Sequence, residues 1–290
     1  LKGNVRALLK RKANVMEDFR ANVSSYKRQM NAIRALRSEE YSSRNLKDIL
    51  LNVEEPEEIP TIFKPKFIEK KLNDSQQQAV IKALNSENIS LIQGPPGTGK
   101  TKVIKEISGQ VIKGTVKTTD SPRILIVSQS HTAVDNILEG LDNIIPDDLQ
   151  IVRIGADKNV SPKISCKYTM SAHRDMLFGT IKDKIDAYDR SKEALLDGIT
   201  NQQELDRWIK IKNIQRNWIE RSVEKDCLDY QMIRSATVIA GTCIGFLANS
   251  FVKDMEFDYV IIDEAAKATT PELLVSIIKA KKIILVGDQN

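Results

Sequence analysis

The sequence predicts an α/β fold in which helices flank a parallel β-sheet and one loop of the sheet binds phosphate. Three observations carry this prediction: short runs rich in Ile and Val, a glycine-rich stretch reading LIQGPPGTGKT at 91–101, and an acidic pair after the apolar run 260–262. Strands buried on both faces of a parallel sheet have this continuous apolar character. In such sheets ligands bind beyond the carboxyl ends of the strands, where both the glycine-rich stretch and the acidic pair are expected.

Six short apolar runs are the candidate strands, and helical patterns follow several of them. They cover residues 89–92, 124–127, 151–154, 237–240, 259–262 and 283–286. Parallel strands need a crossover between them, commonly a helix, so this alternation favours a parallel sheet over an antiparallel one.

Two further segments have helical character without strands. Residues 5–51 place apolar side chains three, four and seven apart, and a stretch with two prolines and four glutamates at 53–60 ends the pattern. Residues 172–232 are long, charged and helical with a break near Gly198, which we interpret as an antiparallel helical hairpin inserted into the sheet domain. The predicted organisation is a helical stalk region and linker over 1–60, a sheet domain over 61–156 and 236–290, and a helical insertion over 157–235.

Composition limits the class of protein. With 290 residues, 41% of them hydrophobic, the chain can build a sizeable core, and no stretch approaches the 18 apolar residues of a membrane-spanning helix. The first ten residues lack the pattern of a signal peptide, and the missing N-terminal Met suggests a fragment. Three scattered cysteines and two histidines argue against a zinc site and favour reduced thiols, so we expect a cytoplasmic protein with no membrane partner.

Positive charge is concentrated at the N-terminal end. The net charge is +5, and residues 1–52 carry 12 Lys and Arg against 5 Asp and Glu, so the rest of the chain is slightly acidic. A basic segment of this kind favours a polyanionic partner, but the solvated face of a charged helix explains it equally well.

The stretch 91–101 has the spacing of a phosphate-binding P-loop, because Gly94 is followed after four residues by Gly99, Lys100 and Thr101. Glycines let backbone N–H groups converge on an anion, and the start of the next helix adds positive potential. Lys100 can reach the β- and γ-phosphates, and the Thr101 hydroxyl can ligate Mg²⁺. The residues expected to bind the nucleotide are Gly94, Pro95, Gly97, Thr98, Gly99, Lys100 and Thr101.

The acidic pair Asp263–Glu264 stands at the predicted carboxyl end of a strand. Asp263 can hold the Mg²⁺ that Thr101 also touches, and Glu264 can orient and activate a water. Alone, such a pair is usually a charge pair at a helix start, but its place downstream of a P-loop favours catalysis. Because a P-loop kinase must keep water away from the γ-phosphate, the pair predicts hydrolysis, with Lys100, Asp263 and Glu264 as catalytic residues.

Several other polar residues allow two interpretations. Gln76 lies eighteen residues before Gly94, and its amide can donate and accept at once, as pairing with adenine requires. In isolation, Gln76 is only one polar residue of a glutamine-rich helix start. Ser130, Thr132 and Thr242 follow apolar runs and can hold a nucleic-acid backbone. For Thr132 and Thr242, capping of a helix is an equally good explanation.

The order of these pieces resembles that of superfamily 1 helicases. The stretches LNDSQ, GPPGTGKT, SQSHTAVDN, GTCIG, IIDEAAKATTPELL and LVGDQN are similar, in sequence and in order, to the Q motif and motifs I, Ia, Ic, II and III of that superfamily. The similarity is strongest to the group that contains the nonsense-mediated-decay helicase, senataxin and bacterial relatives. It covers residues 72–290, weakly over 157–235 where that family carries a variable helical insertion, and only loosely over 1–70.

This resemblance implies a RecA-like P-loop NTPase domain and assigns roles to single residues. Gln76 would contact adenine, Glu264 the attacking water, and the three hydroxyl residues single-stranded DNA or RNA. One departure concerns motif III, whose γ-phosphate-sensing glutamine would fall one residue beyond Asn290, so Gln289 should not inherit that role. The resemblance also implies that the second motor domain and its arginine fingers lie outside these 290 residues.

The predicted function is therefore that of the first motor domain of an ATP-dependent helicase, which binds ATP and Mg²⁺ and couples hydrolysis to movement along single-stranded nucleic acid. The isolated piece should be nearly inactive. The alternative is a nucleotide-gated module that binds nucleic acid or protein without unwinding. The tandem acidic pair favours turnover, whereas a chain truly ending at Asn290 would favour the switch. A small-molecule kinase is disfavoured, since no lid-like arginine cluster follows the P-loop.

Overall fold

The computed structural model describes residues 20–51, 53, 65–113, 122–142, 144, 149–196, 201–222 and 225–288. Within them, six strands form one sheet in which every pairing is parallel. The strands are β1 (Ile89–Gln93), β2 (Ile124–Ser128), β3 (Ile151–Arg153), β4 (Val238–Thr242), β5 (Phe257–Asp263) and β6 (Ala280–Gly287). Each overlaps one of the apolar runs identified in the sequence, so the predicted α/β fold class is confirmed.

The strand order across the sheet is β1-β6-β5-β2-β4-β3. Strand β6 therefore separates β1, which leads into the glycine-rich loop, from β5, which delivers the acidic pair. Because all strands are parallel, their carboxyl ends meet at one edge of the sheet. At that edge Ser128 of β2 is level with Thr242 of β4 and Asp263 of β5.

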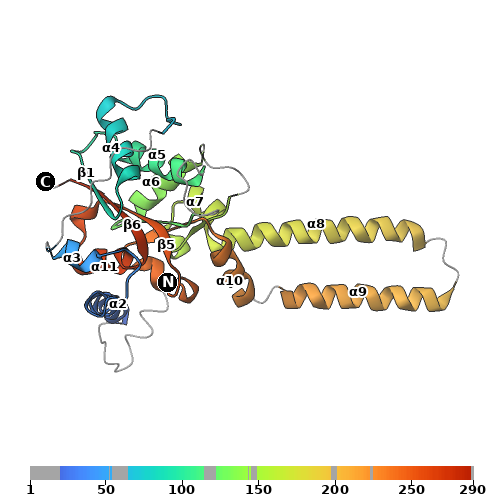
Figure 1. Cartoon of the computed structure of the whole chain (residues 1–290). Coiled ribbons are helices and arrows are strands. Elements are labelled where there is room, and N and C mark those ends of the chain that lie inside the picture. The colour runs from blue at the N-terminus through green and yellow to red at the C-terminus, as the bar shows by residue number, and fades with distance from the viewer. Residues whose placement is uncertain are drawn as a thin grey trace, which may run out of the picture.

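Helices cover both faces of the sheet (Figure 1). In β2, Ile124 and Ile126 belong to one core, Leu125 and Val127 belong to the other, and all four are fully buried. Successive side chains of a strand point to opposite faces, which explains why the sequence shows a continuous apolar run. The helices that pack in the core of Ile124 and Ile126 are α4 (Asp74–Asn85), α5 (Lys100–Ile112), α6 (His131–Leu141) and α7 (Pro162–Tyr168). The helices that pack in the core of Leu125 and Val127 are α2 (Arg20–Arg37), α3 (Leu46–Leu50), α10 (Lys225–Ser235) and α11 (Thr270–Ile277).

Two long helices, α8 (Met170–Leu196) and α9 (Gln202–Ser222), lie side by side and extend away from the sheet (Figure 1). The rings of Tyr188 and Trp208 meet between them at 6.1 Å. The side chain of Asn201 accepts a hydrogen bond from the N–H of Gln203 at 3.0 Å at the start of α9, as an N-cap residue does. The predicted break near Gly198 lies outside the described residues. Although α8 and α9 are long enough to cross a bilayer, neither they nor any other helix in the described ranges has the apolar stretch this would need.

Candidate nucleotide-binding and hydrolysis site

The glycine-rich loop joins β1 to α5 at the carboxyl edge of the sheet. Gly97 and Gly99 have φ angles of 80° and 85°. Residues with a Cβ rarely adopt such angles, so the turn depends on glycine at both positions. Inside the loop, the Thr98 hydroxyl donates a hydrogen bond to the carbonyl of Pro95 at 2.8 Å. The loop is therefore held in shape by its own backbone and side chains.

The start of α5 fits a phosphate group. The N–H groups of Lys102 and Val103 both donate to the carbonyl of Gly99, at 2.9 and 3.2 Å, so the hydrogen bonds of the helix begin there. The N–H groups of Lys100 and Thr101 precede these bonds. They stand at the positive end of the helix, where backbone donors and the helix dipole together attract anions.

Lys100 lies across the loop. Its ammonium donates hydrogen bonds to the carbonyls of Gly94 and Pro95, the second at 3.1 Å. These carbonyls keep the positive charge beside the backbone that would carry the phosphates.

Asp263 ends β5 and is only 7% exposed. One of its carboxylate oxygens accepts a hydrogen bond from the N–H of Glu264 at 2.9 Å. Burial is the main influence and raises the pKa of Asp263, with the charge of Lys100 opposing the shift. A divalent cation beside this carboxylate would stabilise its charged form, and carboxylate and hydroxyl oxygens are ligands that Mg²⁺ takes. The chemistry of Asp263 and Thr101 therefore fits a magnesium ion.

Gly287, at the end of β6, joins the loop to the acidic pair. Its carbonyl accepts a hydrogen bond from the N–H of Gly94 at 3.1 Å. A Cβ at this position would lie 3.2 Å from the backbone nitrogen of Ala266 and 3.5 Å from that of Ala265. Any larger residue would push the segment after the acidic pair away from β6 by a few tenths of an ångström, so glycine suits this close approach. In the sequence, Gly287 is the glycine of LVGDQN, and its neighbours along the chain do not indicate which segment it contacts.

Glu264 combines an uncommon backbone with a side chain that contacts two partners. Its φ of 52° and ψ of 34° lie in the left-handed region, which is uncommon for non-glycine residues. One carboxylate oxygen lies 2.5 Å from the ammonium of Lys267. The other accepts a hydrogen bond from the hydroxyl of Ser130 at 3.3 Å. The carboxylate raises the pKa of Lys267 through the hydrogen bond and the ion pair.

Comparison with known proteins now decides the family. A family model described as an AAA domain matches residues 71–290. The chain belongs to this AAA domain family. Three curated relatives support the resemblance to superfamily 1 helicases. An uncharacterized ATP-dependent helicase of Methanocaldococcus jannaschii is 30% identical, over 96% of this chain and 46% of the relative.

The two other relatives are eukaryotic. DNA polymerase alpha-associated DNA helicase A of Schizosaccharomyces pombe is 31% identical, over 77% of this chain and 32% of the relative. Regulator of nonsense transcripts 1 of Dictyostelium discoideum is 29% identical, over 80% of this chain and 16% of the relative. The predicted resemblance to the nonsense-mediated-decay group of superfamily 1 helicases is confirmed. The chain spans less than half the length of each of these relatives.

Gln76 connects α4 of the AAA domain to the P-loop. Its amide nitrogen donates to the carbonyl of Thr98 at 2.8 Å, and its amide oxygen accepts from the N–H of Asn73 at 3.0 Å. Asn73 in turn accepts from the N–H of Gln76, which completes a capping box. These bonds use one of the two N–H donors of the amide and one of the two lone pairs of its oxygen. The second N–H and the second lone pair are the ones that pairing with adenine would use.

The three predicted nucleic-acid contacts lie at the ends of β2 and β4, two neighbouring strands. Ser130 caps α6 by accepting from the N–H of Ala133 at 3.1 Å. Thr242 likewise accepts from the N–H of Gly245 at 3.1 Å, in the turn that opens the next helical segment. Thr132 is exposed in the first turn of α6. Capping thus accounts for Ser130, Thr242 stabilises the turn that precedes a helical segment whose N-cap is Ile244, and Thr132 is not the N-cap of α6.

A buried polar network behind α6 is a feature that the sequence analysis missed. Arg153 and Asp135 are 1% and 3% exposed, and the Arg153 Nε lies 2.8 Å from a carboxylate oxygen of Asp135. Arg153 also contacts the His131 ring at 3.1 Å, and Asp135 accepts from the N–H of Ser161 at 2.7 Å. Burial first, and the charge of Arg153 second, lower the pKa of His131. The only signals in the sequence are an Arg inside an apolar strand and an Asp on an apolar helix.

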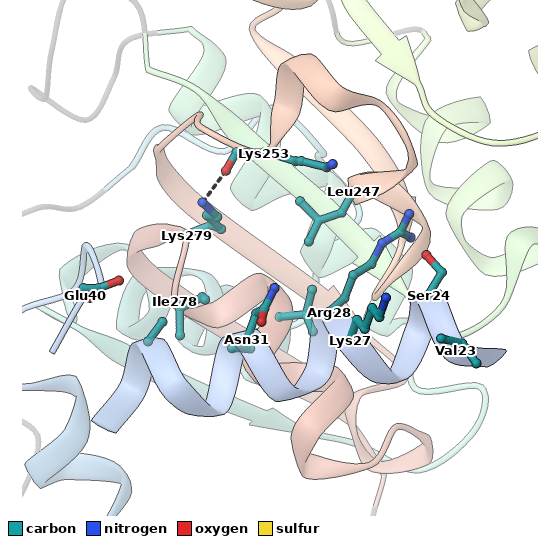
Figure 2. A pocket seen from close by; sticks show the side chains of 13 residues that line it. Val23, Ser24, Lys27, Arg28, Asn31, Glu40, Leu247, Lys253, Ile278 and Lys279 are labelled. Carbon is teal, nitrogen blue, oxygen red and sulfur yellow. Dashed lines mark hydrogen bonds between the residues drawn. The ribbon is translucent and has the colours of Figure 1, made fainter. Parts of the chain in front are cut away.

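The structure describes part of the basic N-terminal segment as α2, which precedes the residues matched by the AAA family model. Its Lys27 and Arg28 face a groove of about 900 Å³, with Lys253 and Lys279 on the opposite side (Figure 2). Arg28 donates to the carbonyl of Ile244 at 3.0 Å, and Lys279 donates to the carbonyl of Lys253. Arg28 and Lys279 therefore also hold neighbouring backbone segments together.

Proposed function

We propose that this AAA domain is the first motor domain of an ATP-dependent helicase, which hydrolyses ATP to move along single-stranded DNA or RNA. The observation that carries the proposal is the position of β6, whose Gly287 places the P-loop beside the segment of Asp263 and Glu264. The names of the relatives, which include ATP-dependent and DNA helicases, support the nucleic-acid partner. Their greater length supports a contribution to activity from residues outside this chain.

Each site residue then has a defined task. The N–H groups at the start of α5 and the ammonium of Lys100 would hold the phosphates, and Thr101 with Asp263 would hold Mg²⁺. Bound ATP–Mg²⁺ supplies the phosphoryl group and the charge that makes its phosphorus reactive. Glu264 would accept a proton from the attacking water. Each Glu264 oxygen has one contact among the described residues, with Lys267 or with Ser130, and keeps a further lone pair that can accept from water.

We propose the same division of the chain as the sequence predicts. The helical stalk covers 1–60, the ATP-binding unit covers 61–156 and 236–290, and the insertion covers 157–235. The order of elements along the chain supports the limits of the insertion, because α7, α8, α9 and α10 all follow β3 and precede β4 in the sequence.

The test measures ATP binding and phosphate release separately. Lys100→Ala should abolish ATP binding, while Lys113→Ala, an exposed lysine just beyond the other end of the same helix, should not change it. Glu264→Gln should bind ATP normally and lose hydrolysis. Unchanged binding by Lys100→Ala would contradict the P-loop assignment. A protein whose strand affinity responds to ATP without any hydrolysis would be the nucleotide-gated module instead.

A further inference from the structure

Lys267 and Ser130 converge on a single anion, the carboxylate of Glu264. The ammonium lies 2.5 Å from one oxygen and the hydroxyl donates to the other at 3.3 Å. The Lys267 side chain is 65% exposed, and Ser130 is exposed as well. Two donors from separate loops, both open to solvent, therefore already form a small anion-binding pair at the carboxyl edge of the sheet.

We propose that Lys267 is a phosphate-binding residue for single-stranded nucleic acid, and that Glu264 occupies the phosphate position while no strand is bound. The inference rests on the proposed function, because it gives a partner contact and a means of regulation to the same site. Phosphate oxygens, like carboxylate oxygens, accept from ammonium and hydroxyl groups, which are the usual contacts to a nucleic-acid backbone. The sequence resemblance assigns no role to Lys267.

Neighbouring acids do not compete for Lys267 in the same way. A carboxylate oxygen of Asp263 accepts the N–H of Glu264, and the Glu272 carboxylate accepts the N–H of Thr269 in the capping box of α11. The Lys267 backbone is fixed by its N–H bond to the Glu264 carbonyl at 2.9 Å, so only its flexible side chain has to move. An approaching phosphate thus needs to displace one exposed ion pair.

The exchange would link strand binding to hydrolysis. A phosphate that takes Lys267 and Ser130 leaves the Glu264 carboxylate free to accept a proton from water. The carboxylate and the strand compete for Lys267, and such coupling is reciprocal. A variant that lacks the Glu264 charge should therefore release Lys267 and bind the strand more tightly. This change in affinity is measurable without any ATP.

The experiment is a titration of labelled oligodeoxythymidine with the full chain, without nucleotide, at several salt concentrations. One phosphate contact contributes about 0.7 to the salt dependence of a single strand, which corresponds to about fivefold in affinity at 0.1 M salt. Glu264→Gln and Lys267→Gln should differ in affinity by about this factor, with the parent between them, because the parent must break the ion pair before Lys267 reaches a phosphate. Lys267→Gln should bind more weakly than the parent, Lys267→Arg should bind like the parent, and the double variant Glu264→Gln/Lys267→Gln should bind like Lys267→Gln.

The matched control is Glu139→Gln. The pair of Glu139 and Lys163 is 3.1 Å long, with side chains 33% and 70% exposed, close to the 26% and 65% of Glu264 and Lys267. It reports what loss of one surface carboxylate does by itself. Equal gains in strand affinity for Glu139→Gln and Glu264→Gln would overturn the inference. So would a gain in affinity from Glu264→Gln that persists when Lys267 is also replaced by Gln. Either result would leave the proposed function untouched. No strand binding by the parent at low salt would overturn both the inference and the proposed function.

Discussion

Replacing Arg153 by Ala should destabilise the protein strongly, because the change leaves the buried carboxylate of Asp135 without its cation. Asp135 is 3% exposed and, among the residues that the structure describes, would keep the N–H of Ser161 as its hydrogen-bond donor, at 2.7 Å. Removing one partner of a buried ion pair lowers the free energy of unfolding by about 3–5 kcal/mol. At roughly 2–4 °C per kcal/mol for a chain of this size class, the melting temperature should fall by about 6–20 °C.

Urea unfolding followed by circular dichroism measures this loss, and the slope against urea should stay unchanged if the native state keeps its compactness. Lys163→Ala is the control, because its side chain is 70% exposed and its pair with Glu139 should contribute about 1 kcal/mol or less. The double variant Arg153→Met/Asp135→Leu removes both charges and should be far more stable than Arg153→Ala. A loss below about 1 kcal/mol for Arg153→Ala would refute the reasoning.

Four further predictions address the site. If Gln76 pairs with adenine, ATP should bind more tightly than GTP by about 1–3 kcal/mol and Gln76→Ala should erase the difference; equal weakening of both nucleotides would assign Gln76 to loop positioning. Oligonucleotide affinity should fall steeply with salt, because bound phosphates release counterions, and a flat titration would remove nucleic acid as a partner. Phosphate release by the 290-residue chain should be slow, about 10³–10⁵ below a full-length relative, since an arginine finger contributes that factor; a rate equal to the relative's would contradict the two-domain mechanism. The pKa of His131 is lower in the folded state than the unfolded value of about 6.5, so its contribution to the free energy of unfolding is present above that value and is lost as pH falls below it. His131→Gln should therefore flatten the decline in the urea midpoint between pH 7 and pH 5. An unchanged decline in the variant would argue against this role of His131.

The strands and the phosphate loop could be predicted from the sequence because their causes are local. A run such as 124–127 is apolar at every position because both faces of β2 are covered, and this needs no knowledge of which strand is the neighbour. The turn at Gly97 and Gly99 is likewise set by two residues that tolerate positive φ. The candidate roles of Lys100 and Thr101 follow from their distance along the chain to that turn.

Other properties depended on which strands became neighbours. Gly287 joins the loop to the acidic pair only because β6 lies between β1 and β5, and the periodicity of a sequence carries no record of strand order. The same holds for the contacts of Ser130 with Glu264 and of Arg153 with Asp135, whose partners are 134 and 18 residues apart. The sequence by itself determined which residues could bind phosphate and metal, since those properties belong to side-chain chemistry and short spacings. Only the tertiary structure decided that the candidate base also accepts a hydrogen bond from Ser130, because a bond between two loops forms after the sheet has brought the loops to one edge.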